Sequence, residues 1–191
     1  MARLSPAESA GARDRILAGA RVLGAREGVG ALSLKAIATE ARVSKALVLY
    51  HFAGKSALLD AIVTAVGEAS AERLAAATRM SHAMPAWRGL LGSATARGEA
   101  ALLCALVLEA ETTARAARAA QAMRENAATA LALAVLGDIG LSPRVPAVAI
   151  GRLLLRQLDG LAAASPRDEM ARDALEAELD TFALALIGLA D

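Results

Sequence analysis

The chain has 191 residues, of which 56% are apolar and only 2% aromatic, and its formal net charge is +1. One cysteine, Cys104, cannot form an internal disulfide, and the longest uncharged run, Asn126–Gly137, is too short to span a bilayer. No secretion leader is recognisable, and alanine, leucine, arginine and glutamate are typical of packed helices. We therefore expect a soluble all-α protein of the reducing cytoplasm, with no membrane partner.

Charge is distributed unevenly along the chain. Residues 1–55 carry nine Lys and Arg against four acidic residues, a net charge of +5, whereas residues 56–191 carry a net charge of −4. A basic module joined to a mildly acidic remainder is typical of a protein that binds a polyanion through one end. The alternative is an ordinary solvated charged surface.

The N-terminal third contains a predicted helix followed by two short ones. Residues 1–12 lack an apolar period and are expected to form a flexible arm, and apolar residues at helical spacing predict a first helix over 13–27. Ser33 and Ser44 are good N-cap residues and begin two short helices separated by a tight turn. A supporting helix followed by such a pair is the helix-turn-helix arrangement, which we predict for 13–55.

The remaining residues, 56–191, are predicted to be helical throughout, and we expect about nine helices in the whole chain. Alanine at many interior positions allows the helices to approach closely, as in a tight bundle. The predicted helices cover about 56–79, 86–113, 115–136, 146–164 and 167–189.

Several short motifs occur together in the N-terminal part. They read R-x-R-I-L-x-x-A at 13–20, L-x-x-I-A-x-x-A at 34–41, V-S-K at 43–45, H-F at 51–52 and K-x-x-L-L at 55–59. With these motifs the segment resembles the DNA-binding domain of the TetR family of one-component transcriptional regulators. The resemblance implies a DNA-binding domain at 13–55 and an effector-binding and dimerisation domain at 56–191.

The same resemblance, together with side-chain chemistry, assigns candidate contacts to double-stranded DNA. The second short helix would lie in the major groove, and the residues around it would hold phosphates. The candidates are Ser33, Lys35, Arg42, Ser44, Lys45, Ala46, Leu47, Leu49, Tyr50, His51 and Lys55.

Three positions depart from the family pattern. The family usually has Gly at Arg42, Gly or Pro at Ala46, and a phosphate-binding tyrosine at Leu49. Here the tyrosine is Tyr50, about 100° further around the helix. With Leu47 and Leu49 near the groove, base reading would rely on apolar contact with thymine methyl groups. The alternative is that Leu49 packs inward.

The last two predicted helices carry apolar stripes. In the family this pair forms a four-helix interface with a twofold mate, so the resemblance implies a homodimer, which would match a palindromic operator. The alternative is a pair of ordinary core helices. The stripe residues are Leu154, Leu158, Leu161, Leu175, Leu179, Phe182 and Leu186.

Family members usually bind a small-molecule effector inside the C-terminal bundle, and adaptable apolar side chains are candidates for lining such a pocket. Each candidate could equally be plain core, and Cys104 could be a buried small hydrophobe or a reactive thiol. No cofactor or metal site is predicted. The candidates are Met80, Met84, Trp87, Leu103, Cys104, Val107 and Met123.

Two functions from different classes fit these patterns. The first is a sequence-specific transcriptional repressor, without enzymatic activity, that leaves a palindromic operator when a small-molecule effector binds. The alternative is a helical dimeric interaction or ligand-binding protein whose degenerate head has lost specific DNA binding, as Ala46 and Leu49 suggest.

Overall fold

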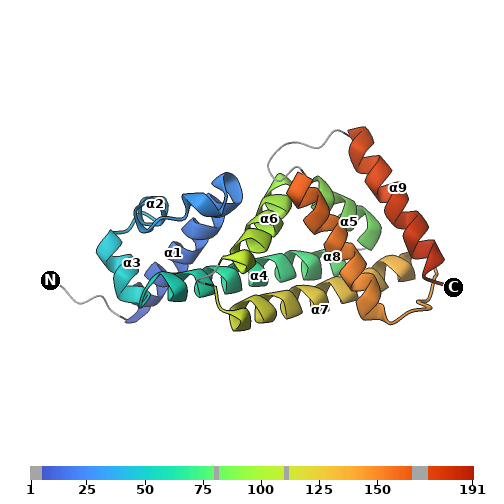
Figure 1. Ribbon diagram of the computed structural model, residues 1–191. Helices are drawn as coiled ribbons and strands as arrows, with labels where there is room; N and C mark the ends of the chain where they lie inside the picture. The colour runs from blue at the N-terminus through green and yellow to red at the C-terminus, as the bar shows by residue number, and fades with distance from the viewer. Residues whose placement is uncertain (1–5, 80–81, 110–111, 165–171) are drawn as a thin grey trace.

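The computed structural model describes residues 6–79, 82–109, 112–164 and 172–191. All the regular elements in these residues are helices, nine α-helices and one 3-10 helix (η1), so the predicted all-α class is confirmed. Figure 1 shows them in chain order. They are α1 (Pro6–Glu27), η1 (Val29–Ala31), α2 (Leu34–Glu40), α3 (Lys45–His51), α4 (Lys55–Thr78), α5 (Ala83–Gly92), α6 (Ala94–Leu108), α7 (Ala114–Asp138), α8 (Ala147–Ala164) and α9 (Arg172–Gly188).

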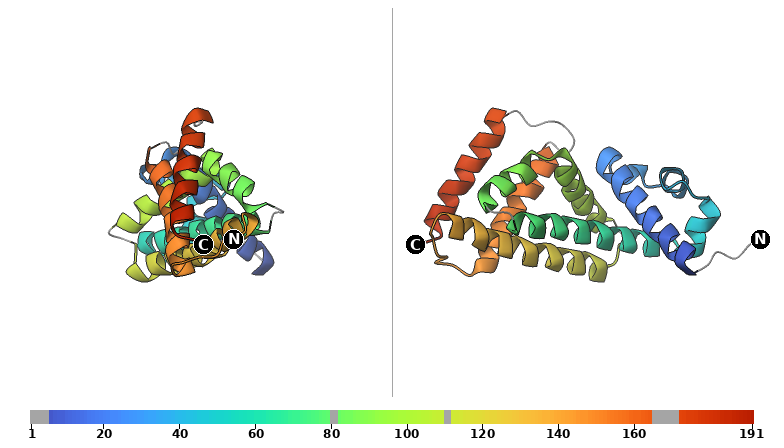
Figure 2. Two further views of the ribbon diagram at one scale, coloured as in Figure 1. Left: turned by 90° about the vertical axis from the view of Figure 1, so that its right-hand side faces the viewer. Right: turned by 180° about the vertical axis from the view of Figure 1, so that it is seen from behind.

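The molecule is elongated, with a small head at one end. We call α1–α3 the head and α5–α9 the body; α4 runs from the head into the body (Figures 1 and 2). Helix α4 packs along α7, and α7 packs against α8. The α4–α7 crossing is close because Gly67 faces Ala120: a Cβ at Gly67 would lie 2.6 Å from the Ala120 Cβ.

Two hydrophobic cores hold these parts together. The head core joins α1–α3 and the first half of α4 to three leucines of α6: Leu102, Leu103 and Leu106. The body core lies among α5, α7, α8 and α9, with Trp87 and Phe182 in contact at a ring-centroid distance of 6.1 Å. Helix α6 therefore contributes to the interior of the head although it belongs to the body.

Two predicted helix boundaries are wrong. Helix α1 begins at Pro6 and not at residue 13, because proline suits the first helical position and the alanines and glutamate that follow are strong helix formers. The single helix predicted over 86–113 is two helices bent by 70°, since Ser93 leaves helical geometry and its Oγ accepts a hydrogen bond from Ala96 N at 3.2 Å.

Most of the predicted dimer stripe is also wrong. Leu154, Leu158, Leu161, Phe182 and Leu186 are buried in the body core of the single chain, so they cannot form an exposed interface. Leu179 is half-buried against the same core, and the side chain of Leu175 lies outside the described residues. An apolar stripe indicates a buried face, but it does not say whether the same chain or a partner covers it.

Among the described helices, none alone has the length and apolar character needed to span a bilayer. The bent pairs α3–α4 and α5–α6 reach that composition only when each pair is taken together.

Candidate nucleic-acid interface

The helix-turn-helix is built by two serine caps and a left-handed turn. Ser33 Oγ accepts a hydrogen bond from Ala36 N at 3.2 Å, and Ser44 Oγ accepts one from Leu47 N at 3.1 Å. These side chains satisfy backbone amides at the starts of α2 and α3, as their sequence positions predicted. Between the helices, Arg42 has a φ of 54°, the left-handed conformation that explains why glycine is common at such a position.

Helix α3 has one buried and one exposed side. Val48 is fully buried and Phe52, which follows the helix, is almost fully buried. Leu49 and Tyr50 are 49% and 75% exposed, so the alternative in which Leu49 packs inward is wrong. Lys45 and Ala46, at the start of α3, are exposed as well, and Leu47 is half-buried.

His51 and Arg13 lie at the end of α3. The His51 ring contacts Tyr50 edge-on with centroids 5.2 Å apart, and its Nε2 is buried without a hydrogen-bond partner in the described part of the chain. Arg13 of α1 places its guanidinium 5.4 Å from the centre of the Phe52 ring, a cation–π contact. Arg13 brings a further exposed cation beside α3; it was not among the predicted contacts, although it opens the first motif.

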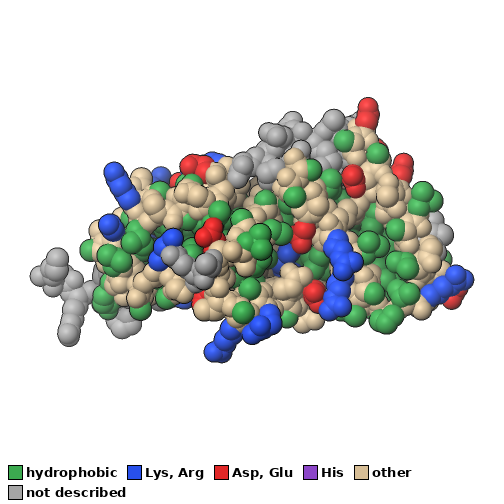
Figure 3. All heavy atoms as spheres, viewed as in Figure 1, with side chains coloured by type: hydrophobic (Ala, Val, Ile, Leu, Met, Phe, Trp, Pro, Cys, Tyr) green, Lys and Arg blue, Asp and Glu red, His purple; other side chains and the backbone are tan. Residues whose placement is uncertain are grey.

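The other predicted contacts surround α3 on the head surface. Ser33, Lys35, Arg42, Ser44 and Lys55 are all exposed, Lys35 on α2, Arg42 and Ser44 in the turn, and Lys55 at the first turn of α4. On the face seen in Figure 3, Lys and Arg side chains project from the head end of the molecule. Basic and apolar groups are thus presented together around an exposed helix.

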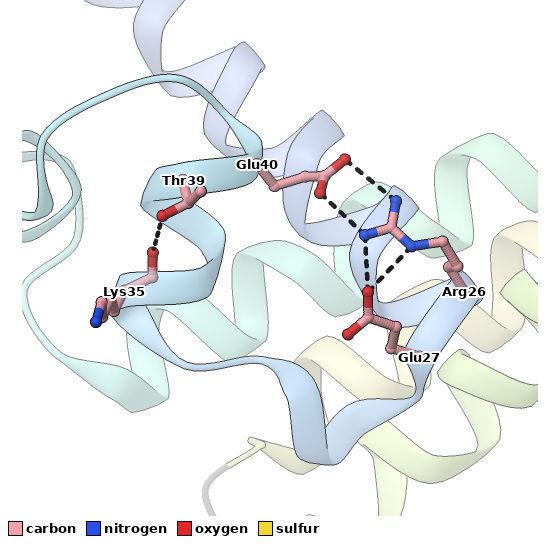
Figure 4. A network of polar contacts seen from close by, with 5 residues as sticks. All are labelled: Arg26, Glu27, Lys35, Thr39 and Glu40. Atoms are coloured by element: carbon pink, nitrogen blue, oxygen red, sulfur yellow. Dashed lines mark hydrogen bonds and ion pairs between the residues drawn. The ribbon is translucent and has the colours of Figure 1, made fainter.

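Not every cation of the head is available to a polyanion. Arg26 is bound by two carboxylates, with Nη2 at 2.8 Å from Glu27 Oε1 and 3.1 Å from Glu40 Oε2 (Figure 4). The hydrogen bond to Glu40, then that to Glu27, raises the pKa of Arg26. In Figure 4 the Lys35 side chain points away from this cluster, which leaves it to solvent.

The described members of the predicted effector pocket lie in different parts of the structure. Trp87 is buried in the body core and Leu103 in the head core, whereas Val107 is exposed. Met84 lines a surface groove between α5 and α9, and Met123 lines another between α4 and α7. Cys104 is half-buried on α6, and Met80 lies outside the described residues. Residue type alone does not predict in which core or groove each of these side chains lies.

The body interior instead contains charged groups that the sequence reasoning missed. Arg124 of α7 is 1% exposed, donates to Ser70 Oγ at 3.1 Å, and forms an ion pair with Asp159 of α8. Glu99 of α6 is 3% exposed and pairs with Arg73 of α4. A small cavity lies beside these groups; it is lined by Ser70, Arg73, Leu74, Leu90, Ala96, Glu99 and Leu158.

The carboxylate of Asp159 also affects the thiol of Cys104. Burial, and secondly the nearby Asp159 carboxylate, raise the pKa of its thiol. A thiol with a raised pKa is a poor nucleophile at neutral pH. Within the described segments, no three His, Cys, Asp or Glu side chains are grouped in a way that could hold a metal ion.

The head sequence matches a known family. Residues 16–62 match the family model described as "Bacterial regulatory proteins, tetR family". That segment covers α2, α3, the turn between them and the start of α4, which form the site described above. A search of curated proteins finds no match to the chain.

The whole chain resembles solved structures. A transcriptional regulator from Rhodococcus sp. Rha1 is 23% identical with a TM-score of 0.70, covering 92% of this chain and 96% of that one. A TetR family transcription regulator from Marinobacter aquaeolei VT8 is 17% identical with a TM-score of 0.65, covering 98% and 100%. FadR from Bacillus subtilis, solved in complex with stearoyl-CoA, is 11% identical with a TM-score of 0.61, covering 92% and 97%. The chain therefore has the fold of TetR-family transcriptional regulators.

Proposed function

We propose that this chain, which has a tetR-family head and the fold of TetR-family regulators, is a sequence-specific DNA-binding repressor that acts in the cytoplasm. The observation that carries the proposal is the exposed side of α3. Lys45, Ala46, Leu49 and Tyr50 face solvent while Val48 anchors the helix from behind. A short helix held in this way can enter the major groove with its N-terminal residues against base edges.

The groups around α3 can hold the phosphate backbone on both sides of the groove. The exposed hydroxyl of Ser33 and the ammonium of Lys35 would meet one strand, and Lys55 and Tyr50 the other. Arg13, fixed over Phe52, adds a cation on the same part of the head. Such contacts supply affinity, and the residues of α3 supply specificity.

We further propose a homodimer, in which two heads would read a palindromic operator. Since the predicted stripe is mostly internal, the contact must use other residues. Leu184 of α9 is 72% exposed and lies on one of the two helices that the family resemblance assigns to the dimer contact, so we assign it to the interface. Replacing Leu184 with Glu should give monomers in light scattering, whereas Leu108→Glu, at an 85% exposed position of α6, should not. Equal behaviour of the two variants would exclude this face.

The repressor would be released by a small molecule bound in the body. FadR, which shares the fold, has been solved with stearoyl-CoA, so this fold can hold a small molecule with a long acyl chain. Release requires that the ligand bind more tightly to the conformation in which the heads do not fit the operator. No catalytic step is needed for this activity.

One DNA-binding measurement tests both the repressor and the alternative, a head that no longer binds DNA specifically. Fluorescence anisotropy should show nanomolar, salt-dependent binding to the intergenic DNA beside the gene and much weaker binding to random duplex. Lys45→Ala should weaken binding and lower the salt slope by about one. Arg156→Ala, which removes an exposed cation from α8, is the matched control and should leave binding unchanged. Equal affinity for both duplexes would exclude the repressor and favour the alternative.

A further inference from the structure

A buried carboxylate lies where the head meets the body. Glu99 of α6 accepts two hydrogen bonds from Arg73 of α4, at 2.9 Å from Nε and 2.8 Å from Nη2. Nε of Arg21 in the head helix α1 lies 3.3 Å from Glu99 Oε1, the oxygen that also accepts from Arg73 Nη2. One carboxylate thus connects a head helix to two helices that extend into the body.

Helices α1 and α6 are in close contact beside this carboxylate. A Cβ at Gly98 of α6 would lie 2.7 Å from the carbonyl oxygen of Ala25 in α1. One at Gly24 of α1 would lie 2.6 Å from a methyl group of Leu102 in α6. Because each helix offers a glycine to the other, α1 and α6 approach closely beside the Arg21–Glu99 contact. The Arg21–Glu99 distance therefore depends on how α1 sits against α6.

The two arginines are not equivalent. Arg73 is held by two aligned hydrogen bonds, which raise its pKa. The buried Nε of Arg21 makes no hydrogen bond with any described residue, although it lies close to the carboxylate. Arg73 therefore keeps Glu99 neutralised within the bundle, whereas Arg21 adds an attraction that acts only between head and body.

Glu99 and Arg73 also border the small cavity in the body. Glu99, Arg73 and Ser70 line it together, and Ser70 accepts a hydrogen bond from Arg124, which pairs with Asp159 of α8. Polar contacts that join α1, α6 and α4 thus border the same cavity as those that join α4 to α7 and α8.

We propose that Arg21 and Glu99 are positioning residues that fix the angle of the head against the body, and so the spacing of half-sites that the protein accepts on DNA. The first part of this proposal stands on the intrachain contacts alone. The second part rests on the proposed DNA-binding function.

Substitutions of Arg21 test whether it fixes the angle of the head against the body. Arg21→Gln removes the head–body attraction while Arg73 still neutralises Glu99, so the variant should fold. Arg21→Lys keeps a cation at the same place. Arg26→Gln is the matched control, because its ion pairs with Glu27 and Glu40 lie wholly within the head.

Electron paramagnetic resonance on the full chain detects a change in this angle through the distance between head and body. Spin labels at the exposed positions Thr39 (α2) and Ala163 (α8), in a Cys104→Ala background and diluted with unlabelled chain, report the head-to-body distance. We expect a broader or shifted distance distribution for Arg21→Gln, the original distribution for Arg21→Lys and no change for Arg26→Gln. An unchanged distribution for Arg21→Gln, or an equal change in Arg26→Gln, would overturn the proposal.

DNA binding then tests the consequence for spacing. The preference for the native half-site spacing over one lengthened by a base pair should fall by about fivefold or more in Arg21→Gln and recover in Arg21→Lys. An unchanged preference would overturn the role in spacing. Absence of specific DNA binding by the unsubstituted protein would instead overturn the proposed function and leave the distance measurement to decide the positioning role.

Discussion

The guanidinium of Arg124 donates to both carboxylate oxygens of Asp159, at 2.5 Å from Nη2 and 3.3 Å from Nη1, and so joins α7 to α8 inside the body. Removal of the carboxylate would leave a buried cation whose remaining contact is the Ser70 hydroxyl. We predict that Asp159→Asn lowers the free energy of unfolding by about 3 kcal/mol. Urea titration followed by circular dichroism measures this change.

The control for this prediction is Glu68→Gln, which removes a carboxylate from the exposed side of α4. It should change stability by less than about 0.5 kcal/mol. If the two variants unfold at the same urea concentration, the Arg124–Asp159 pair contributes no more than a surface charge.

Two glycines of α8 should respond in opposite directions to the same substitution. A Cβ at Gly151 would lie 2.5 Å from Thr129 Oγ1 and 2.7 Å from the Thr129 Cα, whereas nothing lies within 4 Å of one at Gly160. We predict that Gly151→Ala destabilises the chain by about 2 kcal/mol because α7 and α8 must separate. Gly160→Ala should stabilise it by up to about 1 kcal/mol through helix propensity. Thermal unfolding of the pair is the measurement, and a stabilising Gly151→Ala would contradict the close α7–α8 approach.

The head could be predicted from the sequence largely because its determinants are local. Ser33 and Ser44 cap the helices that follow them, and the spacing of Val48 and Phe52 alone predicts which side of α3 is buried. The family motifs add the positions of exposed residues around α3.

The body could be predicted only as a set of helices. Glu99 and Arg124 stand in alanine-rich helices where charged residues usually face solvent, and their partners Arg73 and Asp159 are distant in sequence. For Leu154 and Phe182, periodicity indicated burial correctly but could not identify the covering surface. These features depend on tertiary packing, which no local pattern records.

Cys104 should react slowly with alkylating reagents. Burial, with a smaller effect from Asp159, raises the pKa of its thiol in the folded chain above the ordinary value that it recovers on unfolding. Below the ordinary value both states keep the proton, and as the pH rises past it only the unfolded chain loses the proton. Any stabilisation from this group is thus complete at lower pH and is lost as the pH rises through the folded pKa.

The measurement for Cys104 is the rate of iodoacetamide modification against pH, with the urea-unfolded chain as reference. The folded chain should reach its half-maximal rate at a higher pH than the unfolded chain, whose midpoint should lie at about pH 8.5. Coincident midpoints, or a lower one for the folded chain, would show a reactive thiol and contradict the prediction.

Leu49 and Val48 are neighbours in α3 that should separate DNA binding from stability. Val48 is fully buried, so Val48→Ala should cost about 2 kcal/mol of stability. Leu49 is 49% exposed, so Leu49→Ala should leave the urea midpoint nearly unchanged while weakening specific DNA binding. If Leu49 contacts a thymine methyl group, replacement of that thymine with uracil, which lacks the methyl, should weaken the unsubstituted protein but not Leu49→Ala. Equal sensitivity of both proteins to every such replacement would mean that Leu49 contacts no thymine methyl, and a lowered urea midpoint for Leu49→Ala would mean that the side chain stabilises the head.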